Sequence, residues 1–251
     1  MKSDRLRIEI NPGYSHLRSF VETLPQRFDS EGEPVFRHRN EVRSFGWNGE
    51  KVAVKSFHRP SFFNRIVYTF FRSSKAKRAY RYSFMLNERG IGSPMGIACV
   101  ETRRHGLIDA SFFVSPYSGL KPVFPEIVTA TEFDVSLARA VGRFFATMHV
   151  AGVLHGDPNL KNILYGKTSD GDFRFEVIDT NRSRFREKCT RRECVENLKR
   201  VTHRRDALRM IVSEYAMARG MDADSLVKDV SAALDRFERQ KERRRRLKKL
   251  F

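Results

Sequence analysis

The spacing of apolar residues changes near residue 131, and this change constrains the fold more than any other feature of the chain. Before it, short runs rich in Val and Phe alternate with polar residues and are separated by turn material, as in β-strands. After it, Phe133, Leu137, Val141, Phe144 and Met148 recur every three or four residues, as on the buried face of a helix. The sequence therefore predicts a β-rich first part followed by a mainly helical second part.

The expected elements can be placed more closely from turn and cap signals. Asn48-Gly49 is the clearest hairpin signal. Residues 73–89 form a basic segment with apolar residues at helical spacing, and Gly90 follows where a helix C-cap glycine belongs. The predicted strands are 33–39, 41–47, 51–57, 97–103, 107–116, 162–165 and 173–178, and the predicted helices are 73–89, one that begins at about 131, and those from about 191 to the end.

Length and composition exclude several classes of protein. The chain has 251 residues, of which 40% are hydrophobic, which is too much apolar surface for a disordered polycation. No run approaches the roughly 18 apolar residues of a membrane span, and the first residues contain no apolar core of a secretion signal. The three cysteines have no CxxC spacing, so we expect reduced thiols in a cytoplasmic protein.

The charge of the chain calls for an acidic partner. With 48 Lys and Arg against 30 Asp and Glu, the formal net charge is +18, which suits nucleic acid, a phosphorylated metabolite or an anionic membrane. Residues 236–251, the basic tail, hold nine Lys and Arg and two Glu. The tail suits an anionic lipid surface, with solvation of a helix end as the alternative, and nucleic acid is disfavoured because aromatic residues are nearly absent from it.

Four polar side chains have the chemistry that phosphoryl transfer from ATP requires. Asp157 lies in a loop after the helix that begins near residue 131, and Asn162 follows five residues later. Asp179 follows a strand-like run, and Lys55 ends the run Val-Ala-Val-Lys. A lysine can hold the phosphates, and amide and carboxylate oxygens can hold Mg²⁺. Asp157 is then left to orient the acceptor hydroxyl and accept its proton.

Several motifs carry a resemblance to a known family. The segment HGDPNLKN at residues 155–162 resembles the catalytic loop of the protein-kinase-like superfamily, in the form found in small-molecule kinases, and VAVK resembles its strand-lysine motif. Together with residues 39–40, 74–78, 90–94 and 178–185, these motifs resemble the lipopolysaccharide inner-core kinases, the Kdo/heptose kinase family, over residues 30–215.

The resemblance implies an α+β, protein-kinase-like bilobal fold. Residues 1–115 would form a small antiparallel β-rich lobe with one main helix that binds the nucleotide. Residues 116–251 would form a larger, mainly helical catalytic lobe that ends in the basic tail.

The resemblance also assigns roles residue by residue. Phe113–Tyr117 would be the hinge that meets adenine, through Ser115 and Tyr117. The remaining assignments are Lys55 to the ATP phosphates, Asp157 to the catalytic base, and Asn162 and Asp179 to Mg²⁺.

Three further cations are candidate site residues on other grounds. Lys161, four residues after Asp157, is placed where a cation could neutralise charge on the transferring phosphoryl group. Arg182 and Arg184, just after the predicted metal ligand Asp179, could bind an anionic acceptor such as the carboxylate of Kdo, or could simply be surface charges.

Two features depart from the family pattern. Arg81 stands where the helix should supply a glutamate to pair with Lys55, so either another acid pairs with that lysine or activity is weakened. The glycine-rich loop is also poor, because residues 29–33 contain one glycine and three acids.

The expected function is ATP- and Mg²⁺-dependent phosphorylation of a sugar hydroxyl, on Kdo or heptose, in the lipid A–linked inner core at the cytoplasmic face of the inner membrane. The alternatives are an atypical protein kinase, a kinase for a soluble small molecule, a catalytically degenerate membrane-bound scaffold and a basic RNA-binding protein. The sequence leaves the sugar and the oligomeric state open.

Overall fold

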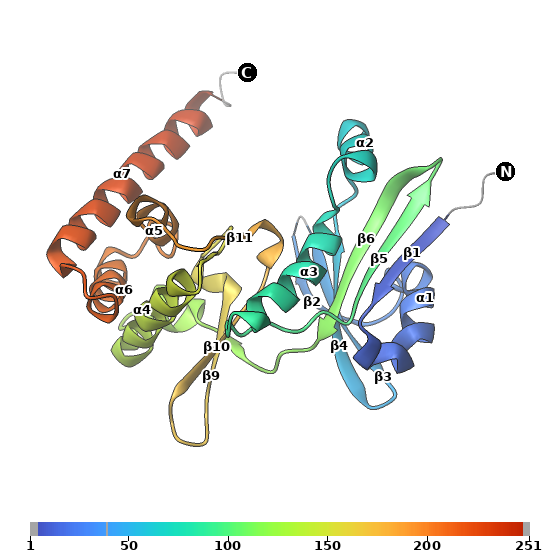
Figure 1. Cartoon of the computed structure of the whole chain (residues 1–251), viewed down its shortest axis with the longest axis horizontal. Helices are drawn as coiled ribbons and strands as arrows, with labels where there is room; N and C mark the ends of the chain where they lie inside the picture. Colours follow the sequence, from blue (N-terminus) through green and yellow to red (C-terminus); the bar gives the residue numbers. More distant parts are fainter. Residues whose placement is uncertain (1–4, 39, 248–251) are drawn as a thin grey trace. The chain divides into compact units, whose positions relative to one another are not determined.

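The computed structural model describes residues 5–38 and 40–247, which divide into two compact units (Figure 1). Unit 1 comprises residues 1–89 and 93–119, and unit 2 comprises residues 90–92 and 120–251. The division after Gly119 lies a few residues beyond the predicted lobe boundary at 115/116. Arg39, in the first predicted strand, and residues 248–251 of the basic tail lie outside the described residues.

Unit 1 is built on a six-stranded antiparallel sheet. The strand order is β1-β5-β6-β4-β3-β2. The β3–β4 hairpin turns at Asn48 and Gly49, both with positive φ, as the sequence predicted. The strands are β1 (Arg5–Ile10), β2 (Glu33–Arg37), β3 (Glu41–Trp47), β4 (Glu50–Phe57), β5 (Ala98–Arg104) and β6 (Leu107–Pro116).

Three α-helices and one short 3-10 helix accompany this sheet. The 3-10 helix η1 (Pro12–Leu17) leads directly into α1 (Arg18–Arg27), followed along the chain by α2 (Phe62–Phe70) and α3 (Lys75–Glu88). The hydroxyl of Ser74 caps α3 by accepting from Lys77 N, and Gly90 follows with φ +72°, so the predicted helix is confirmed.

The core of unit 1 lies between α1 and one face of the sheet. Phe20, Val21 and Leu24 of α1 are fully buried and pack with strand residues such as Val54 and Val114. The opposite face of the sheet carries a smaller cluster formed by Phe57 and Cys99 with residues of α3. Alternate residues of a strand point to opposite faces, so the sheet separates an α1 side from an α3 side.

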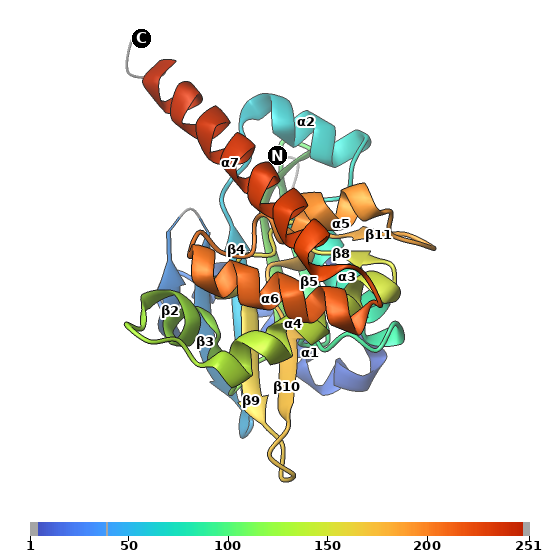
Figure 2. The ribbon, with the colours of Figure 1, turned by 90° about the vertical axis from the view of Figure 1, so that its left-hand side faces the viewer.

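Unit 2 is mainly helical. In Figure 2, α4 (Val135–Val150) lies beside α6 (Arg205–Ala218), and α7 (Ala223–Leu247) packs on α6 and on α5 (Arg191–Leu198). Two small sheets, in the orders β10-β9-β7 and β11-β8, complete it. The remaining elements are β7 (Lys121–Pro122), η2 (Pro125–Thr129), β8 (Val153–Leu154), η3 (Leu160–Asn162), β9 (Ile163–Lys167), β10 (Phe173–Val177), η4 (Thr180–Arg182) and β11 (Arg184–Phe185).

The structure adds several elements that the sequence patterns did not predict, and β1, α1 and α2 of unit 1 are among them. Strand β1 covers one edge of the sheet, and α1 and α2 join α3, the one main helix expected in the first lobe. The α1 helix contains Pro25 and a mixture of polar and apolar residues, which hid its periodicity. No helix within the described residues combines the length and apolar character needed to cross a membrane.

Replacing Phe20 tests the packing of the unpredicted helix α1. Its ring is fully buried and contacts the rings of Phe45 and Trp47. We expect Phe20→Ala to lower the free energy of unfolding of unit 1 by about 3–5 kcal/mol in a urea titration, because it leaves a cavity. The exposed Phe36 on β2 is the matched control, and Phe36→Ala should change stability by less than about 0.5 kcal/mol. Equal effects at the two positions would contradict the assignment of Phe20 to the core.

Candidate active site

The loop that carries Asp157 begins where α4 ends. Gly152, with φ +71°, turns the chain after the helix, and a Cβ at this position would lie 2.0 Å from the carbonyl oxygen of Arg186. The two-residue strand β8 then pairs with β11 and leads into residues 155–159. The short helix η3 and strand β9 follow, so the loop is held at both ends by regular structure.

His155 braces the loop from inside unit 2. The ring is buried and bridges two segments, with its Nε2 3.0 Å from the carbonyl oxygen of Ile178 and its Nδ1 accepting a hydrogen bond of 2.9 Å from the backbone N–H of Asp157. This pattern requires the neutral ring, protonated at Nε2. Burial lowers the pKa of His155, which keeps the ring in this state. His155 is therefore structural.

A second layer of buried polar groups holds the backbone of the loop. Asn197 of α5 donates from Nδ2 to the carbonyl oxygen of His155 at 2.7 Å. Its Oδ1 faces His149 Nε2 at 3.1 Å, and His149 Nδ1 lies 3.0 Å from the hydroxyl of Tyr215. Burial lowers the pKa of His149 to about 4 and raises that of Tyr215, so both groups are neutral at pH 7. This chain joins α4, α5 and α6 behind the loop.

Asp157 itself is half-buried and faces a cation that the motif does not contain. Arg200 lies 3.3 Å from Asp157 Oδ1 and donates to the carbonyl oxygen of Gly156 at 3.0 Å. The arginine thus orients the carboxylate and supports the loop backbone. Neither Arg200 nor Asn197 was singled out from the sequence, because both lie about 40 residues after the loop and their own segment has no motif.

The two predicted metal ligands are brought together by the β9–β10 hairpin. Ile163 pairs with Val177 in this hairpin, and Ile178 N donates to Asn162 O at 3.0 Å. Asn162 Nδ2 donates to the backbone oxygen of Asp157 at 2.9 Å, so the amide oxygen is the atom that can act as a ligand. All three of Asp157, Asn162 and Asp179 therefore belong to one small region of unit 2.

Asp179 has an unusual backbone conformation. Its φ of +57° and ψ of 42° are left-handed, which is uncommon for a residue other than glycine. Its Oδ1 accepts a hydrogen bond of 2.6 Å from Asn181 Nδ2. The amide oxygen of Asn162 and the carboxylate of Asp179 are hard oxygen donors, so this pair fits Mg²⁺, which typically binds one or two protein carboxylates and completes its shell with phosphate and water.

The three candidate cations of this unit are exposed. Lys161 lies with its Nζ 4.4 Å from the ring centroid of Phe124. Arg182 ends η4, and Arg184 begins β11. Gly156 packs tightly on Arg182, since a Cβ on Gly156 would lie 2.3 Å from the carbonyl oxygen of Arg182. The structure thus places Arg182 directly against the catalytic loop.

In unit 1, Lys55 and Ser115 share one face of the sheet. Lys55 pairs with Phe113 across β4 and β6, and Ala53 pairs with Ser115 two residues away, so both side chains lie on the α3 side. The half-buried Lys55 has its Nζ 5.3 Å from the ring centroid of Phe57. The backbone N–H of Tyr117 donates to Lys51 O at 2.9 Å, so this donor is already used within the sheet.

The structure shows where Arg81 lies on α3. This residue is exposed on α3, whereas Ala76, Ala79 and Ser83 form the buried face of the helix. Its side chain is therefore reached by solvent, which screens its charge.

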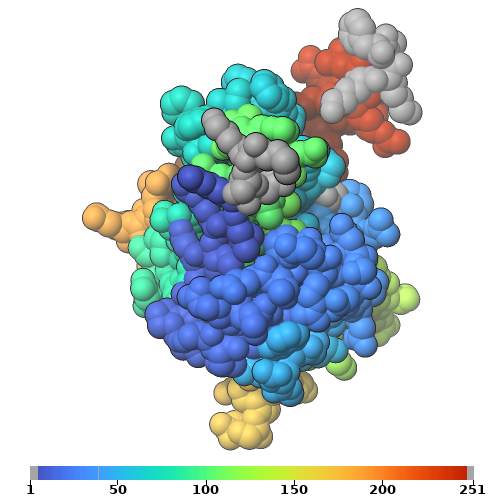
Figure 3. All heavy atoms as spheres, turned by 90° about the vertical axis from the view of Figure 1, so that its right-hand side faces the viewer, coloured from blue at the N-terminus to red at the C-terminus, as the bar shows by residue number. Residues whose placement is uncertain are grey.

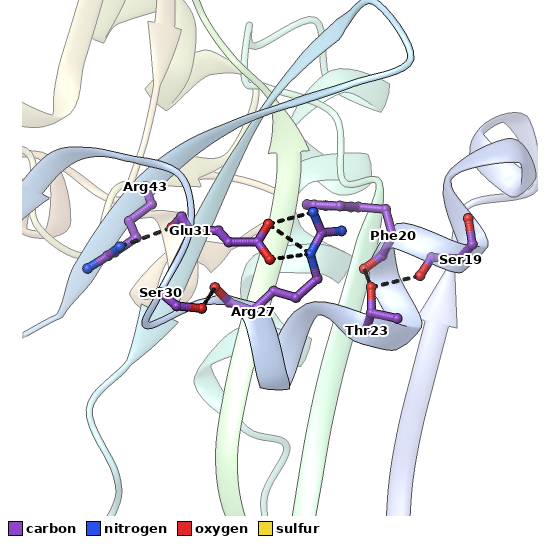
Figure 4. A network of polar contacts seen from close by, with 7 residues as sticks. All are labelled: Ser19, Phe20, Thr23, Arg27, Ser30, Glu31 and Arg43. Atoms are coloured by element: carbon purple, nitrogen blue, oxygen red, sulfur yellow. Dashed lines mark hydrogen bonds and ion pairs between the residues drawn. The ribbon is translucent and has the colours of Figure 1, made fainter.

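The glycine-poor segment 29–33 is held by charge pairs (Figure 4). Arg27 makes bonds of 2.5–2.9 Å to the carboxylate of Glu31, which lower the pKa of that carboxyl, and Arg43 donates to Glu31 O at 3.0 Å. Gly32 has φ +77°, and a Cβ there would lie 2.8 Å from the ring of Phe45. Glu31, one of the acids in this glycine-poor segment, thus has a structural role.

Comparisons with known proteins identify the fold class of the chain. The structure titled "WaaP in complex with acyl carrier protein" aligns with a TM-score of 0.61 at 19% identity, over 94% of this chain and 98% of that one. This likeness confirms the predicted α+β, protein-kinase-like fold class. No curated protein gives a significant sequence match.

A family model identifies the chain more closely. Residues 53–244 match the model described as the lipopolysaccharide kinase (Kdo/WaaP) family, and the chain belongs to this family. It is therefore a lipopolysaccharide kinase, a phosphotransferase, as the motifs of residues 155–162 and 178–185 indicated.

The two buried histidines give the stability of unit 2 a defined pH dependence. In the unfolded chain an imidazole takes up its proton near pH 6.5, but folding holds His149 and His155 neutral. Their stabilising contribution is full above about pH 6.5 and is lost as the pH falls toward 4, by about 3 kcal/mol for His149 alone.

Urea titrations at pH 7, 6 and 5 measure this loss. The variant His149→Asn should be less stable at pH 7 but lose less stability on acidification, whereas His105→Asn, at an exposed turn with φ +55°, should keep the wild-type slope. A wild-type slope in His149→Asn would contradict this assignment.

Proposed function

We propose that this chain transfers the γ-phosphoryl group of ATP, with Mg²⁺, to a sugar hydroxyl of the lipid A–linked inner core, on Kdo or heptose. The family supplies the class of reaction, and the nucleotide, the metal and the acceptor sugar are the proposal. The observation that carries it is the braced loop of unit 2, in which His155 fixes Asp157 and Asn162 next to the turn that contains Asp179.

The carboxylate of Asp157 orients the attacking hydroxyl and accepts its proton. It suits this role because Arg200 holds it in place while it stays half-buried and accessible. Asn162 and Asp179 would hold Mg²⁺, which neutralises charge on the phosphates when it is bound. Lys55 binds the phosphates, and the segment from Ser115 to Tyr117 contacts adenine, with the Tyr117 N–H excluded as a donor because it bonds to Lys51.

The exposed cations serve the acceptor and the transferring group. Lys161, held beside Phe124, offsets negative charge that develops on the phosphoryl group. Arg182 and Arg184 bind an anionic group of the acceptor, such as the carboxylate of Kdo. Kdo carries a carboxylate, so two exposed arginines beside the loop of Asp157 suit an acceptor that contains Kdo better than they suit a neutral soluble sugar.

A lipid-linked acceptor implies work at a membrane surface. The side chains of residues 239–247 of α7 are all exposed, and they include the four arginines 243–246. We propose that this basic end of the helix attracts the anionic cytoplasmic face of the inner membrane, where the protein acts as a peripheral enzyme. Each Lys or Arg near such a surface contributes about 1 kcal/mol.

The rival functions have less support. A protein kinase or a soluble small-molecule kinase does not account for membership in a lipopolysaccharide kinase family, and neither does an RNA-binding protein. A degenerate scaffold was suggested by Arg81 and the glycine-poor segment, but Arg81 is exposed and the segment is ordered by Arg27 and Arg43.

Replacing Asp157 tests the catalytic assignment. We expect Asp157→Asn to lower the rate of phosphoryl transfer by about a hundredfold or more, because the proton acceptor is lost, while the thermal shift caused by ATP and Mg²⁺ is retained. Asp172→Asn, in the exposed β9–β10 turn, is the matched control and should leave both readings unchanged. Wild-type turnover in Asp157→Asn would sink the assignment.

The acceptor is tested by incubating the enzyme with labelled ATP and a lipid A–Kdo extract, followed by mass analysis of the product. We expect one added phosphate on the sugar portion of the lipid. Label in protein instead of lipid would overturn the proposed substrate, and absence of a thermal shift at saturating nucleotide would favour a scaffold.

A further inference from the structure

The α2 helix of unit 1 displays an apolar face that the described part of the chain does not cover. None of its nine residues is fully buried. Four phenylalanines at and beside its ends are exposed: Phe62 at 69%, Phe63 at 74%, Phe70 at 69% and Phe71 at 82%. Aromatic side chains gathered in this way are rarely left in water unless they form an interaction site.

The orientation of α2 is the reverse of an ordinary amphipathic helix. Its polar side faces the protein, since Arg65 donates to the carbonyl oxygens of Ile108 and Arg104 at 2.7 and 3.2 Å, and Thr69 accepts from Ile108 N at 3.0 Å. Arg65 also lies 3.2 Å from Asp109. The helix is thus fixed to the β5–β6 hairpin by polar contacts, and Figure 3 shows its turquoise segment at the surface beside the green hairpin.

The apolar residues occupy the remaining side of the helix. Successive residues rotate by about 100°, which places Phe62, Ile66 and Phe70 in one row and Phe63 and Val67 in the next. Arg65 and Thr69 lie next to the row of Phe62, and both are half-buried, as are Ile66 and Val67. The four exposed rings stand as two pairs, one at each end of the helix, and we call them together the α2 aromatic face, defined as Phe62, Phe63, Phe70 and Phe71.

The charge around this face points to an anionic occupant. Residues 51–87 contain nine Lys and Arg and not one Asp or Glu. Arg59 lies just before α2 and Arg72 just after it, and both are exposed. Arg59 pairs with Asp109 at 2.5 Å, so part of this charge is balanced within unit 1. Arg72, beside Phe70 and Phe71, combines a cation with an aromatic pair at the end of the helix.

We propose that the α2 aromatic face docks on the surface of an anionic lipid bilayer, with the phenylalanine rings among the upper acyl chains and Arg72 at the headgroups. A helix with exposed aromatic residues and with arginines at both of its ends is the kind that lies in a membrane interface. The rings project from a convex helix, so a soft bilayer accommodates them better than a protein, which would need a matching groove. This inference concerns a surface of unit 1 and does not depend on the proposed reaction.

Co-sedimentation of the full chain with vesicles tests the proposal without nucleotide or sugar. The probe is a vesicle of phosphatidylglycerol and phosphatidylcholine at physiological salt, with pure phosphatidylcholine as the uncharged comparison. We expect a variant with serine at all four aromatic positions (F62S, F63S, F70S, F71S) to lose vesicle binding at least about tenfold, because binding scales with inserted apolar area.

Two controls separate this face from general stickiness and from the basic end of α7. Phe36→Ser removes a ring that is 58% exposed on β2, away from α2 in the sequence, and should bind vesicles as the wild type does. Replacing the arginines 243–246 with Gln should leave the aromatic contribution in place, so that adding the four serines to it lowers binding further. Wild-type binding by the four-serine variant, or an equal loss in Phe36→Ser, would overturn the proposal.

A fluorescence measurement guards against a folding defect in the four-serine variant. Trp47 is the one tryptophan of the chain and is partly buried in unit 1, so the wild type supplies the background emission. In Phe63→Trp, the added indole should shift its emission to the blue when anionic vesicles are added. Emission that stays at the wavelength of a water-exposed indole would contradict insertion of this face.

Discussion

Two hydrogen bonds from one buried imidazole organise the catalytic unit. His155 ties the carbonyl oxygen of Ile178, next to the turn that contains Asp179, to the backbone N–H of Asp157. Because the ring must donate at one nitrogen and accept at the other, only its neutral form fits. The geometry of the loop therefore depends on a ring whose protonation state is set by burial. The second layer of Asn197, His149 and Tyr215 supports the loop from behind, because Asn197 donates to the carbonyl oxygen of His155 itself.

The residues that act in the proposed reaction were predictable because they lie in compact motifs. Asp157 and Asn162 occur five residues apart, and Asp179 follows a strand of apolar residues, so local order already indicated their chemistry. The groups that position them were not predictable in the same way. Arg200 and Asn197 reach the loop only through the packing of α5, and their sequence segment resembles that of any solvent-facing helix.

The elements of the fold were likewise predicted where a local sequence signal marks them and missed where their role depends on distant parts of the chain. The β3–β4 hairpin and α3 were predicted, since a turn dipeptide and a cap residue mark each of them. Strand β1 and helix α1 were missed because their role is to cover the edge and the face of a sheet whose other strands lie far along the chain. The α2 helix was missed for another reason, which is that its apolar residues turn outward and its polar residues hold it to the protein.

In the proposed reaction, the contact between Gly156 and Arg182 would link binding of the acceptor to turnover. No side chain fits between the backbone at Gly156 and that of Arg182, so the two segments are in close contact. A ligand that displaced Arg182 would displace the peptide next to Asp157 as well. Discrimination between acceptors in such an enzyme is expressed in kcat, because a poorly fitting sugar spoils the alignment of the proton acceptor even when it binds. Selectivity among acceptors would then depend on the close packing at Gly156 and not on the affinity for the acceptor.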